Sequence, residues 1–297
     1  MLLAALLALA QPAPSEATPP PSGVLVHQSR LFALPDDAVA YIPASASSHP
    51  PLLVLLHGAG RTRLWMIEHF QAEADKRGIV LLAPTSKGIT WDAVSIAMAP
   101  PTGDSPLEMK MGRHFSSSRD SKRVEAAIAS LARIVPIDRA RTVLAGFSDG
   151  ATFALAMGMA RSEQFSAVIA WSPGIAIETS QPARGRKVYV SHGRRDTVLS
   201  FDTDCGEIVP LLQSEGAAVS FLPFDGVHEV PEAAKTAFLD AVFGPVAGTP
   251  AYPLPAKMPV CSCDSGAGQL GVVGEPTGFR PSQATVQGFE KRCGSGN

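Results

Sequence analysis

Residues 141–160 constrain the fold of this chain more than any other stretch. The apolar run Val143-Leu144-Ala145 is followed by the turn Gly146-Phe-Ser-Asp-Gly150 and then by a segment rich in small residues, 151–160. A Gly-x-Ser-x-Gly turn between a strand and a helix is typical of a nucleophile elbow, where both glycines are required because side chains there would clash. Ser148 is therefore a candidate nucleophile, and the alternative is a glycine-rich turn with an inert serine.

Apolar runs and helix-like periods alternate along most of the chain. The runs are continuous rather than alternating, which indicates strands covered on both faces, as in a parallel sheet. The predicted strands are residues 52–56, 79–84, 143–145, 167–171, 187–193 and 218–222, and the predicted helices are 64–77, 124–135, 151–160, 204–214 and one beginning near Pro231. This order predicts an α/β fold, a single domain with a doubly wound, mostly parallel central sheet and helices on both faces.

The two ends of the chain differ in composition from this domain, which we expect to span residues 24–243. Residues 1–23 comprise a leader and a proline-rich spacer, and residues 244–297 form a Gly/Pro-rich tail that contains Cys261, Cys263 and Cys293. The tail has no helical or strand period, so it is expected to be poorly ordered or tied by disulfides. Two cysteines in Cys-x-Cys and one distant cysteine lack a fourth ligand, so no metal is expected there.

The leader resembles a secretory signal. Its apolar run, residues 2–10, is too short to span a bilayer and ends in Ala8-Leu9-Ala10, which is similar to a signal-peptidase site. These features predict export to the periplasm or the medium and no integral membrane segment. Because the first basic residue is Arg30, a cytoplasmic protein with a truncated start or a disordered tail stays open as the alternative.

The net charge of −2 comes without any cluster of Lys or Arg. This pattern gives no reason to expect a nucleic acid or an anionic membrane as partner, and it favours a small-molecule substrate. The oligomeric state cannot be read from the sequence.

A serine nucleophile needs a histidine as base and a carboxylate that orients the histidine. In the elbow architecture these follow the serine in the order acid, then histidine, each after a strand. Asp196 lies 48 residues after Ser148 and follows the predicted strand 187–193; His228 lies 32 residues further on, before the last helix. Ser148, Asp196 and His228 are therefore the predicted catalytic residues.

Other histidines and acids compete for these two roles. His57 and His192 lie at strand ends but precede glycine in tight turns, which favours hydrogen-bonded packing residues. Asp202 and Asp204 lie near or inside the next helix, and Asp225 is only three residues from His228. The remaining histidines past the spacer are His69 and His114.

Backbone N–H groups are expected to stabilise the oxyanion. One is that of Asp149, directly after the serine, and the other comes from the loop after strand 52–56, with Ala59 preferred and Gly60 second. The same loop does not bind a dinucleotide by the usual motif, because Arg63 stands where Gly-x-Gly-x-x-Gly needs glycine.

Residues 86–118 interrupt the alternation of strands and helices with prolines, glycines and scattered apolar side chains. A loop of this length is usually functional or disordered, so we expect a wall or lid of the substrate pocket, with a surface excursion as the alternative. Trp91, Phe147 and Trp171 are the candidate pocket residues.

Together, five motifs resemble the phospholipase/carboxylesterase branch of the α/β-hydrolase superfamily, near the polyhydroxybutyrate-depolymerase-like serine esterases. They are His57-Gly-Ala-Gly60, Gly146-Phe-Ser-Asp-Gly150-Ala, Ser172-Pro-Gly174, Ser191-His-Gly-Arg-Arg-Asp196 and Phe224-Asp-Gly-Val-His228. The resemblance covers about residues 37–243 and implies a Ser-His-Asp esterase without a cofactor. Asp149 departs from many members, which carry Gln there, and its carboxylate is expected to disfavour anionic substrates. The stretch around Cys205 also looks like the family, so Cys205 need not pair with the tail.

The predicted activity is cleavage of carboxylic esters of small or lipid-like substrates through an acyl-enzyme. A polyester depolymerase, a phospholipase or a peptidase would use the same residues. A binding module that kept the fold and lost catalysis is the alternative from a different class of protein.

Overall fold

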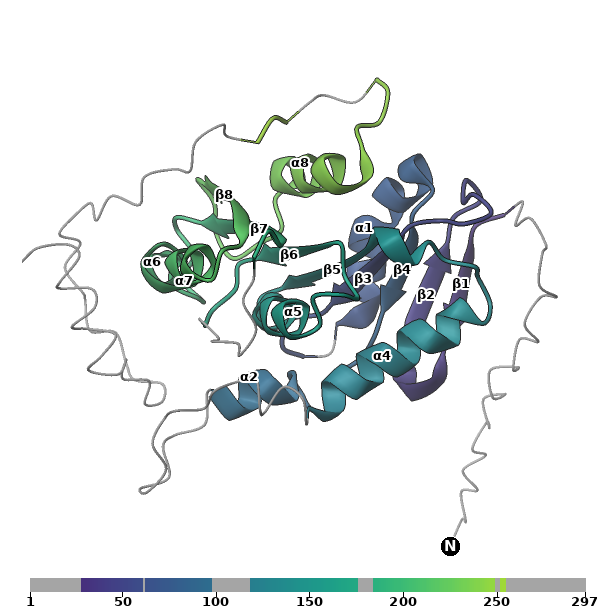
Figure 1. The fold of residues 1–297 in the computed structure, drawn as a ribbon, viewed down its shortest axis with the longest axis horizontal. Helices are drawn as coiled ribbons and strands as arrows, with labels where there is room; N and C mark the ends of the chain where they lie inside the picture. Colours follow the sequence, from purple (N-terminus) through teal and green to yellow (C-terminus); the bar gives the residue numbers. More distant parts are fainter. Residues whose placement is uncertain (1–27, 61, 98–117, 176–183, 249–251, 255–297) are drawn as a thin grey trace, which may run out of the picture.

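The fold is an eight-stranded sheet covered by helices on both faces (Figure 1). The computed structural model describes residues 28–60, 62–97, 118–175, 184–248 and 252–254. The strands are β1 (Arg30–Ala33), β2 (Val39–Ile42), β3 (Leu52–Leu56), β4 (Val80–Ala83), β5 (Thr142–Phe147), β6 (Ala167–Trp171), β7 (Lys187–Gly193) and β8 (Ala218–Phe224). They lie in the order β1-β2-β4-β3-β5-β6-β7-β8, and only the pairs β1–β2 and β2–β4 are antiparallel. The predicted mostly parallel sheet is confirmed.

Helices α4, α5 and α7 pack on one face of the sheet, and α1 and α8 pack on the other. The α-helices are α1 (Arg63–Arg77), α2 (Asp92–Ala97), α4 (Arg119–Ala132), α5 (Asp149–Ala160), α6 (Phe201–Thr203), α7 (Val209–Ser214) and α8 (Glu232–Phe243). Between them lie the short helices η1 (Pro35–Asp37) and η2 (Arg139–Arg141) and the π-helical turn η3 (Asp204–Ile208).

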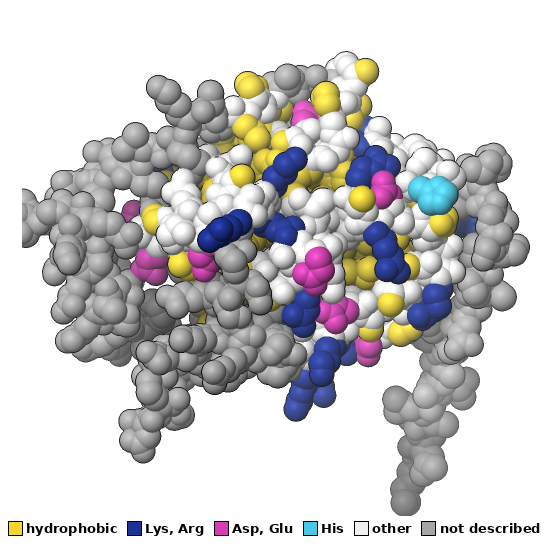
Figure 2. Space-filling view, in the orientation of Figure 1, with side chains coloured by type: hydrophobic (Ala, Val, Ile, Leu, Met, Phe, Trp, Pro, Cys, Tyr) yellow, Lys and Arg dark blue, Asp and Glu magenta, His cyan; other side chains and the backbone are white. Residues whose placement is uncertain are grey.

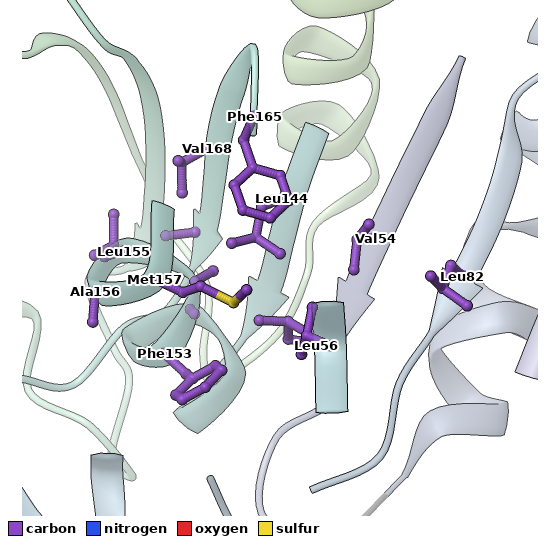
Figure 3. Packing of buried hydrophobic residues seen from close by; sticks show 14 of the residues in the cluster. Val54, Leu56, Leu82, Leu144, Phe153, Leu155, Ala156, Met157, Phe165 and Val168 are labelled. Atoms are coloured by element: carbon purple, nitrogen blue, oxygen red, sulfur yellow. The ribbon is translucent and has the colours of Figure 1, made fainter. Parts of the chain in front are cut away.

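The central strands are almost entirely apolar because both of their faces are covered. In β3, Leu52, Val54 and Leu56 belong to the core under α4 and α5, whereas Leu53 and Leu55 belong to the core under α1 and α8. Figure 3 shows side chains of α5, Met157 among them, beside Leu144 of β5 and Leu56 of β3. This two-sided burial is the physical reason for the continuous apolar runs in the sequence.

Part of the predicted loop 86–118 is helical. Helix α2 occupies residues 92–97, and its first residue is tied to the start of α4. The Asp92 N–H donates to Asp120 Oδ2 at 2.8 Å, and the Asp92 carboxylate accepts from Ser118 Oγ and from Arg119 N, each at 2.7 Å. Residues 98–117 of the predicted lid lie outside the described residues. Two helix starts differ from the prediction: α4 begins at Arg119 rather than 124, and the helical segment predicted from 204 begins at Phe201 and contains the π turn. The last helix begins at Glu232, next to the predicted Pro231.

The predicted leader, and most of the predicted tail with Cys261, Cys263 and Cys293, lie outside the described residues. Leu254 packs against the core under α1 and α8, so contacts with the domain extend past the expected boundary at residue 243. None of the helices in the described ranges combines the length and the apolar character that crossing a membrane requires. Figure 2 shows basic and acidic side chains interspersed over the described part of one face.

A buried arginine ties α1 to the end of α8. The side chain of Arg77 is 3% exposed; its Nε donates to Glu73 Oε2 at 2.9 Å and its Nη1 to Gly244 O at 2.6 Å. Its Nη2 lies 2.7 Å from Asp240 Oδ1, an ion pair without hydrogen-bond geometry. Burial raises the pKa of Glu73, but hydrogen bonds from Lys76 and Arg77 outweigh it, so the pKa lies below the ordinary value of 4.5.

We expect Glu73→Gln to lower the free energy of unfolding at neutral pH by about 1–3 kcal/mol, because Arg77 loses a charged acceptor in a buried site. A folded-state pKa below 4.5 means that this stabilisation is complete above 4.5 and is lost as the pH falls through the folded value. The difference between wild type and variant should therefore shrink on acidification, as measured by urea unfolding from pH 7 down to about pH 4.

The matched control is Glu68→Gln on the exposed side of α1, which should change the free energy of unfolding by less than about 0.5 kcal/mol. Equal stability of Glu73→Gln and wild type at neutral pH would contradict the assignment.

Candidate active site

Ser148 occupies a strained turn between β5 and α5. Its backbone angles are φ 57° and ψ −124°, an unusual conformation for a residue other than glycine. A Cβ atom on Gly146 would overlap the backbone of Gly150, and one on Gly150 would overlap the carbonyl oxygens of Leu56 and His57. Only glycine fits at both positions, which agrees with the steric reason inferred from the sequence.

The structure brings together the three residues that the sequence predicted as catalytic. His228 Nε2 lies 2.9 Å from Ser148 Oγ, and His228 Nδ1 lies 2.6 Å from Asp196 Oδ2. The side chain of His228 is 15% exposed, whereas that of Asp196 is fully buried. The serine and histidine can therefore meet a substrate, and the carboxylate can contact only its neighbours.

Backbone hydrogen bonds join the loops that carry Asp196 and His228. The N–H of Arg194 donates to Phe224 O at 2.9 Å, and the N–H of Arg195 donates to Gly226 O at 2.9 Å. These bonds continue the β7–β8 pairing beyond the strands, so residues 32 positions apart are held at hydrogen-bond distance.

The surroundings of Asp196 keep its carboxylate ionised. Burial raises its pKa, but hydrogen bonds from the Leu199 N–H at 2.9 Å, from His228 and from the Val198 N–H at 2.8 Å outweigh it and hold the pKa below 3.8. An ionised Asp196 accepts the Nδ1–H of His228, which leaves Nε2 free to take a proton from the serine.

The rival acids are engaged elsewhere or lie at the surface. Asp225 is exposed and forms an ion pair with Arg195 at 2.9 Å, and Asp202 is exposed at the start of the helical segment 201–214. Asp204 is buried and contacts His192, not His228.

The loop after β3 lies directly against the nucleophile, since a Cβ on Gly58 would be 3.2 Å from Ser148 Cβ. The N–H of Gly60 donates to Ile89 O at 2.8 Å, so this group holds the loop in place and is already occupied. Of the two N–H groups expected in this loop, that of Ala59 therefore remains the better candidate for the oxyanion donor. On the other side of the site, Thr90 Oγ1 donates to Asp149 Oδ2 at 2.5 Å.

His57 packs beneath this loop, as the sequence indicated. Its ring is fully buried and stacks on Trp91 with centroids 4.7 Å apart. Nδ1 lies 2.6 Å from Gly58 O, and Nε2 accepts from the Ser86 N–H at 3.1 Å, which fixes a neutral ring with the proton on Nδ1. His69 stacks on Trp65, and His114 lies outside the described residues.

Two of the three predicted pocket residues are core residues. Trp91 and Trp171 are 0% exposed, so neither offers surface to a substrate; Trp91 instead donates its indole N–H to His57 O at 2.8 Å and supports the loop. Phe147 is partly exposed and lies 4.7 Å from the His228 ring. Trp65, which the sequence analysis missed, is 38% exposed and lies 5.6 Å from Phe147. The signal that could have indicated Trp65 as a pocket residue was its position at the start of the helix that follows the loop 57–60.

Known structures share this arrangement of sheet and helices. The chain is similar to a puromycin hydrolase (TM-score 0.54, 20% identity), covering 77% of this chain and 41% of that one. It is also similar to the acetyl xylan esterase from Aspergillus awamori (TM-score 0.50, 14% identity, 73% and 99% covered). YahD with malic acid gives a TM-score of 0.50 at 16% identity, with 69% and 98% covered. The protein thus has the α/β-hydrolase fold.

Sequence similarity identifies the family within that fold. Residues 38–229, 192 of the 297, match the phospholipase/carboxylesterase family. The chain therefore belongs to the phospholipase/carboxylesterase family and is a carboxylic ester hydrolase. No curated protein shows significant sequence similarity to it.

We expect Gly146→Ala to abolish most hydrolysis and to destabilise the fold by about 1–3 kcal/mol or more, because the added methyl group overlaps backbone atoms of Gly150 that cannot move independently. Thermal unfolding and turnover of p-nitrophenyl acetate measure both effects. Gly206→Ala is the control, since a Cβ there meets no atom within 4 Å. Full activity of Gly146→Ala would show that the elbow is less tight than described.

Proposed function

We propose that the protein hydrolyses carboxylic esters through a Ser148–His228–Asp196 triad and an acyl-enzyme intermediate. The observation that carries the proposal is the unbroken pair of contacts, 2.9 Å from Ser148 Oγ to His228 Nε2 and 2.6 Å from His228 Nδ1 to Asp196 Oδ2. They join a nucleophile, a base and an orienting carboxylate in the order that acyl transfer needs.

In the first half-reaction His228 Nε2 takes the proton of Ser148 while Oγ bonds to the ester carbonyl carbon. The carbonyl π electrons move to oxygen, and the N–H groups of Ala59 and Asp149 stabilise the resulting oxyanion. When the oxyanion collapses, the bond to the alcohol oxygen breaks, and the protonated His228 gives its proton to that leaving group. Asp196 keeps its charge throughout and stabilises the imidazolium.

In the second half-reaction water takes the place of the serine. His228 removes a proton from water as the oxygen attacks the acyl-enzyme, and it returns the proton to Ser148 Oγ when the acid departs. One water is consumed, and one acid and one alcohol are released.

We expect Ser148→Ala and His228→Ala each to lower kcat on the order of 10⁴ to 10⁶, with little change in folding. Asp196→Asn should lower kcat by a factor on the order of 10⁴, because the amide has the shape of the carboxylate but favours the wrong imidazole tautomer of His228. The double variant Ser148→Ala/His228→Ala should be hardly worse than either single variant, since the residues act as a unit. Initial rates with p-nitrophenyl esters, and covalent labelling of Ser148 by a fluorophosphonate, check these values.

A Ser148→Ala enzyme that hydrolyses esters at the wild-type rate would overturn the mechanism. If Asp196→Asn keeps near-full activity while Asp202→Asn or Asp225→Asn abolishes it, only the choice of acid is wrong.

The surroundings of His228 favour an ester with an apolar group. Phe147 and Trp65 form a partly exposed aromatic surface that extends from the His228 ring, with centroid distances of 4.7 Å and 5.6 Å. Val227, next to His228, is 51% exposed. An apolar acyl or alcohol group placed against this surface would be removed from water near the reacting carbon. A comparison of p-nitrophenyl, feruloyl, phospholipid, polyester and peptide substrates distinguishes an esterase from a phospholipase, a depolymerase or a peptidase.

We expect Trp65→Ala to lower kcat/KM for p-nitrophenyl octanoate about tenfold while leaving that for p-nitrophenyl acetate nearly unchanged, because only the longer acyl chain reaches the lost ring. The control is Leu31→Ala, which removes an exposed apolar side chain from β1, a strand outside the site. Equal losses on both esters would show that Trp65 supports the site rather than contacting the acyl chain.

A further inference from the structure

A second buried histidine–aspartate pair lies behind the triad. His192, in β7, and Asp204, at the first position of the π turn η3, are both 0% exposed. His192 Nδ1 lies 2.8 Å from Asp204 Oδ2. Ester hydrolysis as described above uses neither residue.

The neighbours of His192 fix one of its two protons. Nε2 lies 3.0 Å from Leu199 O, and a carbonyl oxygen only accepts, so Nε2 carries hydrogen. The contact of Nδ1 with Asp204 then holds one further proton, on the ring or on the carboxyl group. In both cases the pair as a whole is neutral and Nε2–H points toward the turn that carries Asp196.

This pair contacts the turn at two points. The Leu199 carbonyl that accepts from His192 belongs to the residue whose N–H donates to Asp196 Oδ1 at 2.9 Å. In addition, His192 Nε2 lies 3.0 Å from Asp196 Oδ2, the same oxygen that accepts from His228. His192 therefore contacts both the backbone of the turn and the oxygen that orients the base.

The charges in this buried cluster support the same arrangement. Burial lowers the pKa of His192, but the hydrogen bond and charge of Asp204, the Leu199 carbonyl and the charge of Asp196 raise it above 6.5. Burial raises the pKa of Asp204 to about 6, against the opposing effect of His192. Asp204 Oδ1 has no hydrogen-bond partner among the described residues, so this carboxylate depends on His192 for its neutralisation.

We propose that His192 and Asp204 are positioning residues for ester hydrolysis, which hold the Asp196 turn so that Oδ2 stays aligned with His228; this inference rests on the proposed function. Asp204 fixes the orientation and protonation of the His192 ring. His192 transmits that constraint to Asp196 through Leu199 O and through its direct contact with Oδ2.

The test compares variants that keep or remove the Nε2 donor. His192→Leu should lower kcat about 10²-fold with KM nearly unchanged, because a small displacement of a catalytic group costs this much. His192→Gln, whose amide nitrogen can occupy the place of Nε2, should regain most of that loss. Val190→Ala, on the same face of β7, is the control for a buried change that does not contact Asp196.

Removal of one member of a buried pair risks unfolding, because the other member is left uncompensated. The double variant His192→Leu/Asp204→Leu removes both polar groups and keeps the site apolar, so it should fold and yet show the same loss of kcat. Circular dichroism and thermal unfolding establish folding for each variant.

A double-mutant cycle tests whether His192 acts through Asp196. Once Asp196→Ala has removed the carboxylate, His192→Leu should lower kcat by less than about twofold further, whereas independent effects would multiply. The inference would be overturned if the kcat losses of His192→Leu and Asp196→Ala multiply in this cycle. It would also be overturned if folded His192→Leu/Asp204→Leu has the wild-type kcat. If Ser148→Ala itself stays active, the proposed function fails instead, so the two failures are distinguishable.

Discussion

The close approach of the Gly150 backbone to the carbonyl oxygens of Leu56 and His57, which leaves no room for a Cβ atom, shapes the site. This contact presses the start of α5 against the end of β3, which puts the loop 57–60 beside Ser148. The elbow and the loop come from neighbouring strands of a parallel sheet, so both lie at the carboxyl edge where such folds bind ligands. A tight turn thereby brings the loop 57–60 and the nucleophile together.

Around that contact, each loop of the site is held by a neighbour that has no chemical part in ester cleavage. Trp91 donates to His57 O beneath the loop 57–60, and Ile89 O accepts from Gly60 N–H. On the opposite side, backbone bonds from Arg194 and Arg195 hold the turn after β7 to the loop after β8. The reactive groups are therefore few, and most of the surrounding hydrogen bonds serve to fix backbone positions.

A feature could be predicted from the sequence when neighbouring residues determine it, and it was missed when distant residues do. The elbow is encoded within five residues, and the strand-end rule for parallel sheets directed attention to Asp196 and His228, which the structure places beside Ser148. The burial of Trp91 and Trp171 could not be predicted, because it depends on elements packed over them from distant parts of the chain. Helix α2 was missed for a similar reason, since its first residue, Asp92, bonds to residues 26 and 28 positions later. The partnership of His192 with Asp204 depends on a π turn that has no recognisable sequence pattern.

Strand β8 lies at the edge of the sheet, so the contacts of the site can open locally while the core strands stay folded. Among the described strands, β8 pairs only with β7. Its residues are mostly half-buried, whereas β3, β5 and β6 are fully enclosed over nearly their whole length. His228 follows this edge strand, while Ser148 follows β5 at the centre of the sheet. Transient detachment of the edge would carry the base away from the serine while the other seven strands remain paired. Because local opening at an edge requires less free energy than global unfolding, the contact of His228 with Ser148 depends on the least enclosed strand of the parallel part of the sheet.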